Sequence, residues 1–109
     1  MTKAHAYSEA DVKEKLKGLP GWWLESGWIR RAYKTDGWPS TLMLVNAIGY
    51  AAQVIDHHPD LEVAWGGIVV KSMTHSAGGV TDKDFELARK IEDLALGTGH
   101  KFVQSGDRK

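Results

Sequence analysis

Residues 61–73 have the sequence LEVAWGGIVVKSM, and this stretch predicts a β-hairpin. The residues on both sides of the Gly-Gly pair include β-branched and aromatic side chains, which are common in strands. Gly66 and Gly67 suit a two-residue turn in which both positions need a positive φ. In an antiparallel hairpin the chain before the first strand lies beside the chain after the second, so the residues that flank this stretch are expected to meet.

Histidines lie on both sides of this hairpin. Residues 56–59 (DHHP) precede it, and residues 74–75 (TH) follow it. Folding the hairpin would bring His75 beside the His57-His58 pair. Imidazole is the side chain best suited to transferring protons near neutral pH. The cluster therefore indicates a proton-transfer site at the open end of the hairpin.

A long helix is predicted just before the histidine pair. Pro39 suits its first turn, and Pro59 forces its end. His57 and His58 therefore lie at or just past the C-terminus of this helix, where the helix dipole favours a protonated imidazole by up to ~1 kcal/mol. The apolar face that is expected to enter the core comprises Leu42, Val45, Ile48, Ala52 and Ile55.

The first part of the chain predicts a second hairpin. Strands are expected over residues 22–25 and 28–34, where aromatic and β-branched side chains are frequent. Residues 26–27 (SG) suit the turn between them. A short helix precedes this hairpin, with Ser8 as its N-cap.

A third helix is predicted after His75. Thr81 and Asp84 stand in the positions of a capping box. The complete order α-β-β-α-β-β-α predicts an α+β fold in which three helices pack on a four-stranded antiparallel sheet. We expect one domain over residues 1–96 and a flexible C-terminal tail over residues 97–109. The apolar face of the third helix comprises Phe85, Ala88, Ile91 and Ala95.

The composition excludes several kinds of site. The chain of 109 residues has no cysteine, which excludes disulfides, a thiolate zinc site and a cysteine nucleophile. Its 14 basic and 14 acidic residues leave no net charge, and no dense basic patch marks a direct nucleic-acid ligand. The N-terminus lacks the apolar run of a signal peptide, and no segment is apolar enough to cross a bilayer. We therefore expect a soluble cytoplasmic protein with no membrane partner.

The spacing of the histidines resembles the signature of a known family. Residues 57–59 (HHP), five residues, Trp65, nine residues, His75, eight residues and Asp84 are similar to the motif of the pterin-4a-carbinolamine dehydratases. The resemblance covers nearly the whole chain, because the order of helices and hairpins also agrees. It implies the same α+β fold, assembled through its sheets into homodimers or homotetramers.

The resemblance implies a dehydratase reaction. The family removes water from 4a-hydroxytetrahydropterin to give quinonoid dihydropterin, during recycling of the tetrahydropterin cofactor of aromatic amino acid hydroxylases. The leaving oxygen needs an acid and a ring nitrogen needs a base, and two histidines in opposite protonation states can supply both. By resemblance, His57 and His75 transfer protons at the 4a-hydroxyl, and His58 takes part in pterin binding and catalysis. The resemblance implies no metal and no redox cofactor.

The resemblance also places five further residues at the substrate: Asp56, Pro59, Trp65, Thr74 and Asp84. Two of these have a structural alternative. Asp84 orients a histidine or caps a helix, and capping is at least as good an interpretation. Trp65 borders the flat pterin or packs in the core, and a Trp in a hairpin more often packs.

Gln53 keeps a second function open. In active members of the family the position four residues before the first histidine is commonly ionisable, whereas Gln forms hydrogen bonds but holds no exchangeable charge. The alternative is a non-catalytic assembly chaperone or interaction protein with a protein client, such as a Rubisco assembly factor of carboxysome-bearing bacteria. The adjacent histidines also have simpler interpretations, as a helix end or as zinc ligands, although no cysteine or well-spaced histidine completes a tetrahedron.

Overall fold

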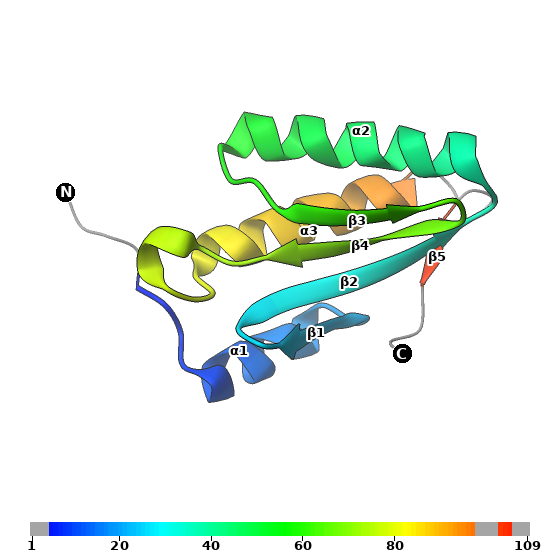
Figure 1. The fold of residues 1–109 in the computed structure, drawn as a ribbon. Helices are drawn as coiled ribbons and strands as arrows, with labels where there is room; N and C mark the ends of the chain where they lie inside the picture. Colours follow the sequence, from blue (N-terminus) through cyan, green and yellow to red (C-terminus); the bar gives the residue numbers. More distant parts are fainter. Residues whose placement is uncertain (1–4, 98–102, 106–109) are drawn as a thin grey trace.

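The structure, a computed structural model, describes residues 5–97 and 103–105. Figure 1 shows helices packed against an antiparallel sheet, so the predicted α+β fold is confirmed. In chain order the elements are α1 (Glu9–Lys15), η1 (Leu16–Gly18), β1 (Trp22–Glu25), β2 (Trp28–Thr35), α2 (Trp38–Ile55), β3 (Asp60–Ala64), β4 (Gly67–Ser72), η2 (His75–Ala77), α3 (Asp82–Gly97) and β5 (Val103–Ser105), where η marks a 3-10 helix.

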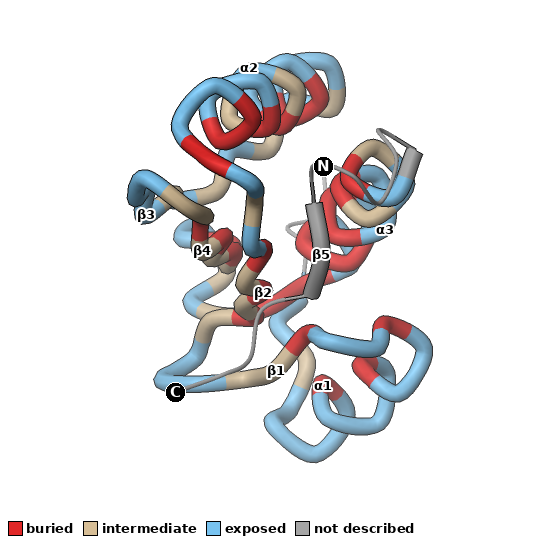
Figure 2. Tube along the Cα trace, turned by 90° about the vertical axis from the view of Figure 1, so that its right-hand side faces the viewer, coloured by how far each residue is buried: buried red, intermediate tan, exposed pale blue. Residues whose placement is uncertain are grey.

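The sheet has the strand order β1-β2-β4-β3, with β5 also paired to β2. All of these pairings are antiparallel. The helices lie on one side of the sheet, with α1 beside β1 and α2 beside β3 and β4 (Figure 2). Strand residues on that side alternate with residues on an open face, which is the usual pattern for an antiparallel sheet covered on one side.

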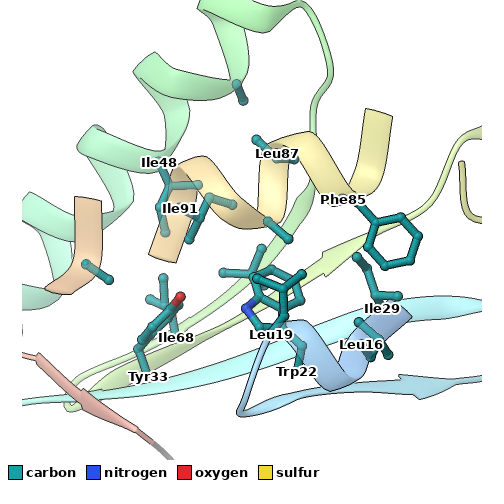
Figure 3. Packing of buried hydrophobic residues seen from close by; sticks show 14 of the residues in the cluster. Leu16, Leu19, Trp22, Ile29, Tyr33, Ile48, Ile68, Phe85, Leu87 and Ile91 are labelled. Atoms are coloured by element: carbon teal, nitrogen blue, oxygen red, sulfur yellow. The ribbon is translucent and has the colours of Figure 1, made fainter. Parts of the chain in front are cut away.

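The core lies between the sheet and the helices. On β2, Ile29, Arg31 and Tyr33 point toward the helices, while Arg30 and Ala32 lie on the open face. Figure 3 shows Ile48 of α2 and Ile91 of α3 meeting above the sheet, and both side chains are fully buried. Burial of one such side chain contributes roughly 1.5–3 kcal/mol to stability.

The two hairpin turns differ. Ser26 and Gly27 have φ angles of 52° and 83°, as a primed two-residue turn requires. The turn between β3 and β4 consists of Trp65 and Gly66 instead of the predicted Gly-Gly pair, because Gly67 already pairs with Ala64 as a strand residue. A Cβ on Gly67 would lie 2.4 Å from the carbonyl oxygen of Tyr33, so glycine is needed here for close strand approach and not for a positive φ.

The α2 helix has apolar residues on two faces. Leu44, Ile48 and Ala52 are buried against the sheet and α3. Leu42 was predicted to be buried, but it is 40% exposed. The expected periodicity selected the wrong residue because Leu42 lies about 120° around the helix from Ile48, outside the buried face. Met43, Tyr50 and Val54 share a separate face of α2 and form an exposed apolar row.

Part of the expected C-terminal tail is paired. Gly97 is the last residue of α3, and β5 pairs with Tyr33–Thr35 of β2. The physical reason is that β2 is longer than β1, so β1 covers only the first half of this edge and leaves room for a second short strand. The rest of residues 97–109 lies outside the described residues.

A buried cluster centred on Glu92 joins α3 to β1 and β2. The Oε1 atom of Glu92 accepts hydrogen bonds from Trp22 Nε1 at 2.9 Å, Arg31 Nε at 2.6 Å and the Tyr33 hydroxyl at 2.6 Å. Arg31 is only 2% exposed, so its charge is compensated inside the protein by Glu92. Gly21 leaves room for the guanidinium, since a Cβ there would lie 2.7 Å from Arg31 Cζ.

Replacement of Tyr33 by Phe tests this cluster through alkaline stability. Burial, and then the hydrogen bond to Glu92, raises the pKa of Tyr33. The folded protein therefore keeps a proton that the unfolded chain releases near pH 10, and the stability linked to it is complete below about pH 10 and is lost as the pH rises further. We expect Tyr33→Phe to lower the free energy of unfolding by about 1 kcal/mol near neutral pH. It should also flatten the alkaline decline, as measured by urea unfolding at a series of pH values.

Tyr50→Phe is the matched control, because Tyr50 is 75% exposed. It should leave both the neutral stability and the alkaline decline unchanged. Equal alkaline curves for Tyr33→Phe and the native protein would show that the Tyr33 proton is not linked to folding.

Candidate active site

The end of α2 positions the histidine pair. Asp56 is the C-cap and has a left-handed conformation, with φ 55° and ψ 45°. Asp tolerates this conformation better than most residues other than Gly and Asn. The His57 N–H still donates to the Ala52 carbonyl at 3.0 Å, which anchors the first histidine to the last turn of the helix. The chain then leaves through Pro59 into β3, so the histidines stand where helix and sheet meet.

His57 is bound to a buried carboxylate. Its Nε2 atom lies 2.7 Å from Oδ1 of Asp84, which is completely buried, while the side chain of His57 is 12% exposed. Because a carboxylate oxygen accepts, Nε2 carries the proton of this bond, and in the neutral ring the lone pair is on Nδ1. The buried Asp84 thus sets both the orientation and the tautomer of His57.

Asp84 accepts hydrogen bonds from four partners in four parts of the fold. Besides His57, its Oδ1 accepts from the Ser72 hydroxyl at the end of β4. Its Oδ2 accepts from the Thr74 hydroxyl and from the backbone N–H of Thr81, both at 2.8 Å. Such a buried carboxylate is tolerated because donors surround it. The sequence left helix capping and histidine orientation as alternatives for Asp84, and its two oxygens make both kinds of contact.

The N-terminal segment braces the loop before α3. The Tyr7 N–H donates to the Val80 carbonyl at 2.8 Å, and the Tyr7 hydroxyl donates to Asp82. This hydrogen bond to Asp82 is the main reason that the pKa of Tyr7 is raised. The Tyr7 ring also packs edge-on against Phe85, with 5.9 Å between centroids. Tyr7 therefore anchors Val80 and Asp82, the two chain neighbours of Thr81, whose N–H binds Asp84.

His58 has a neutral partner. Its Nε2 atom lies 3.0 Å from Oε1 of Gln53, one helical turn back on α2, and both side chains are exposed. With the amide oxygen as acceptor, Nε2 donates here too. Gln53 thus orients the ring without placing a charge beside it.

His75 begins the short η2 helix and is exposed. The loop that carries it is closed by Thr74 and Gly79, whose backbone N–H and carbonyl form a hydrogen bond of 2.8 Å. The His75 ring stands edge-to-face against Trp28, with centroids 5.5 Å apart and an interplanar angle of 79°. Trp28 is the first residue of β2 and lies far from His75 in sequence, so this contact depends on the pairing of β2 with β4.

The strand register brings most of the predicted site residues to one end of the sheet. Asp60 pairs with Lys71, so the chain that leaves His58 runs beside the chain that leads to His75. Asp84 joins this group through its contacts with His57 and Thr74. Asp56 and Pro59 flank the His57-His58 pair in the chain, so they lie at the same end of the sheet.

Trp65 lies at the opposite end of the β3–β4 hairpin. It is 69% exposed, its carbonyl accepts from the Thr41 hydroxyl at 3.0 Å, and its ring borders Gly37. The length of β3 separates it from the histidines of the same chain, about 16 Å for five strand residues. Sequence spacing could not show this separation, and the same spacing gave no sign of Trp28 or Ser72, which only the strand pairing brings to the site.

We also searched the described residues for metal-binding groups, membrane-spanning helices and surface grooves. No group of three or more His, Asp or Glu side chains in residues 5–97 is arranged to hold a metal ion. Among the helices that the structure describes, none is long and apolar enough to span a membrane. A shallow groove of about 470 Å³ on the open face of the sheet lies near Trp65, between β2, β3 and β4, and none of its lining residues is a histidine.

Known proteins are similar to this chain over most of its length. The family model described as pterin 4 alpha carbinolamine dehydratase matches residues 5–94. A protein of Aquifex aeolicus, provisionally named pterin-4-alpha-carbinolamine dehydratase, is 42% identical over 80% of this chain and 88% of its own length. A Streptomyces coelicolor protein with the same provisional name is 40% identical over 88% of this chain and 96% of its own length. The crystal structure of a transcriptional coactivator/pterin dehydratase from Brucella melitensis has a TM-score of 0.79 at 29% identity, covering 84% of this chain and 99% of that one.

Replacement of Asp84 by Asn tests the role of the buried carboxylate. Asn has nearly the same shape, but its amide nitrogen is a donor and would face groups that already donate. We expect the free energy of unfolding to fall by about 1–3 kcal/mol in urea titrations. Nitrogen NMR of the imidazole should also show that His57 loses its preference for the Nε2–H tautomer.

Asp93→Asn provides the control on the same helix, because Asp93 is exposed. Its effect on stability should stay within about 0.5 kcal/mol. An unchanged free energy of unfolding in Asp84→Asn would show that the four donors do not require a carboxylate.

Proposed function

This chain belongs to the pterin 4 alpha carbinolamine dehydratase family, and we propose that it converts 4a-hydroxytetrahydropterin to quinonoid dihydropterin. The observation that carries the proposal is the His57–Asp84 pair, which lies at the same end of the sheet as His58 and His75. An imidazole held by a buried carboxylate is a recurrent arrangement for proton transfer. The substrate is a small-molecule pterin, as the family implies.

The reaction needs two proton transfers and no co-reactant. An acid protonates the hydroxyl oxygen on C4a, the C–O bond breaks, and water leaves. A base removes the proton from a ring nitrogen, and the electrons of that N–H bond form the new double bond of the product. The sum is the loss of one water molecule, so two imidazoles in opposite protonation states suffice.

We assign the proton transfers at the 4a-hydroxyl to His57 and His75. In neutral His57 the Nε2–H bond to Asp84 leaves the lone pair on Nδ1, so Nδ1 is the atom that exchanges a proton with the substrate. His75 follows the end of β4, beside the start of β3, and we assign it the opposite protonation state. His58, exposed and oriented by Gln53, contacts the pterin and supports the transfer.

Further contacts with the pterin are proposed for Asp56, Pro59 and Thr74. Each lies next to one of the histidines in the chain. Trp65 is too far along the hairpin to border a pterin held by the histidines of its own chain. Its proposed role in binding therefore requires a neighbouring copy in a homodimer or homotetramer, which is the assembly we expect for this family. The proposed setting is tetrahydropterin recycling in the cytoplasm.

A second candidate function is a non-catalytic assembly or interaction protein, such as a Rubisco assembly factor. The exposed apolar row on α2 favours it, because Met43, Tyr50 and Val54 are each more than half exposed. Large exposed apolar side chains that lie together often mark a protein-binding surface. Gln53 also favours it, since a neutral amide stands where active relatives commonly have an ionisable group.

The dehydration rate of freshly generated 4a-hydroxytetrahydropterin, with and without the purified protein, tests the proposed reaction. We expect the native chain to accelerate water loss. His57→Ala, His58→Ala and His75→Ala should each lower kcat/KM by about 10²–10⁴, the usual contribution of general acid–base catalysis. His5→Ala is the control, because His5 is exposed and lies outside the histidine cluster. Equal losses from all four variants would contradict the proposed site.

Gln53→Glu separates the two candidate functions. If Gln53 only orients His58, the native chain is active and Gln53→Glu changes its rate modestly. Activity that appears only in Gln53→Glu would identify a retained scaffold with a disabled site. No acceleration by either protein would exclude the dehydratase and favour the interaction protein.

A further inference from the structure

The three histidines of the cluster are held by three different kinds of partner. His57 is bound by a buried carboxylate and His58 by a neutral amide. For His75, within the part of the chain that the structure describes, the side chain has a ring contact with Trp28 and no hydrogen bond or ion pair. The direction of the His75 imidazole therefore depends on an aromatic contact.

Loop contacts fix the backbone position of His75, but they do not fix the orientation of its imidazole. The Thr74–Gly79 bridge closes the loop, and Gly78 turns it with a φ of 73°. These contacts settle where the Cα of His75 lies and leave its side-chain torsions open. An exposed imidazole in such a loop normally exchanges between staggered rotamers. An aromatic ring packed against it restricts that exchange.

Trp28 is half-buried and has a second side-chain contact besides His75. It pairs with Glu25 across the tight turn of the first hairpin, next to the point where Ile29 pairs with Ser72 of β4. Lys71 Nζ lies 5.4 Å from the centroid of its ring, and Lys71 is also paired with Glu62 of β3 at 3.4 Å. Backbone pairing thus fixes the position of Trp28, and the Lys71 ammonium adds a cation–π contact that restricts its indole.

We propose that Trp28 is a positioning residue for the dehydratase reaction, and that its indole holds the His75 imidazole in the orientation that transfers a proton at the 4a-hydroxyl. The edge-to-face arrangement is a preferred geometry of aromatic pairs, so it defines a ring plane as well as a contact. This inference rests on the proposed function, but the orientation of His75 can be measured without any activity.

The structural arm of the test is proton NMR of the His75 imidazole. The indole ring current shifts the resonances of protons held beside it, so Trp28→Leu should move the His75 signals toward those of a freely rotating histidine. Trp28→Phe should keep most of the shift, because Phe can form the same edge-to-face pair. Trp23→Leu is the matched control, since Trp23 lies on the open face of the neighbouring strand and pairs with Arg30. Unchanged His75 signals in Trp28→Leu would overturn the inference.

The kinetic arm distinguishes positioning from direct substrate contact. We expect Trp28→Leu to lower kcat about tenfold with little change in KM, because a misplaced catalytic group slows the step without weakening binding. Trp28→Phe and Trp23→Leu should stay within about twofold of the native kcat. A rise in KM at constant kcat would overturn positioning and show that the indole contacts the pterin itself.

A double-mutant cycle separates positioning from a general packing role. If Trp28 acts through His75, then Trp28→Leu in a His75→Ala background should cause no further loss of kcat. A full additional tenfold loss would mean that Trp28 acts elsewhere, which overturns the inference. If the native chain has no dehydratase activity, the proposed function fails, and the NMR arm alone decides whether Trp28 orients His75.

Discussion

The buried carboxylate of Asp84 is the constraint on which the histidine end of this protein depends. It receives hydrogen bonds from the end of β4, from the loop after it, from the N-terminus of α3 and from His57 just past α2. A carboxylate removed from water must keep such donors, because each one that is lost leaves its charge less compensated. The same requirement that holds these elements together therefore also orients His57.

A second, partly buried carboxylate on the same helix secures the other part of the sheet. Glu92 lies two turns after Asp84 on α3 and accepts from Trp22, Arg31 and Tyr33 of β1 and β2. Asp84 faces β4 and Glu92 faces the first hairpin, so α3 is fastened to the sheet at two points by charge-assisted hydrogen bonds as well as by its apolar face. This rigidity matters to the site, since a general acid or base works only when its ring is well placed.

The three histidines share one location but differ in their surroundings. A carboxylate, an amide and an indole impose different restraints on the imidazoles, and only the first of these partners carries charge. Such differences between neighbouring groups are what allow chemically identical side chains to take different roles in one reaction. The division also explains why Gln53 is compatible with an ordered site, because it supplies orientation to His58 while Asp84 supplies charge to His57.

Periodicity, capping residues and antiparallel pairing are local properties, and from them the sequence predicts the order of helices and strands, the capping of α3 and the placing of the histidines at one end of a hairpin. The residues that contact these histidines come from distant parts of the chain, so their identity depends on tertiary packing. Trp28 reaches His75 through the register of β2 on β4, and Leu42 is exposed because α2 packs on the sheet through the face of Leu44, Ile48 and Ala52. Trp65 lies far from the histidines because a strand of fixed rise separates them. Contacts between distant segments follow from register and packing, and neither is encoded in the spacing of a motif.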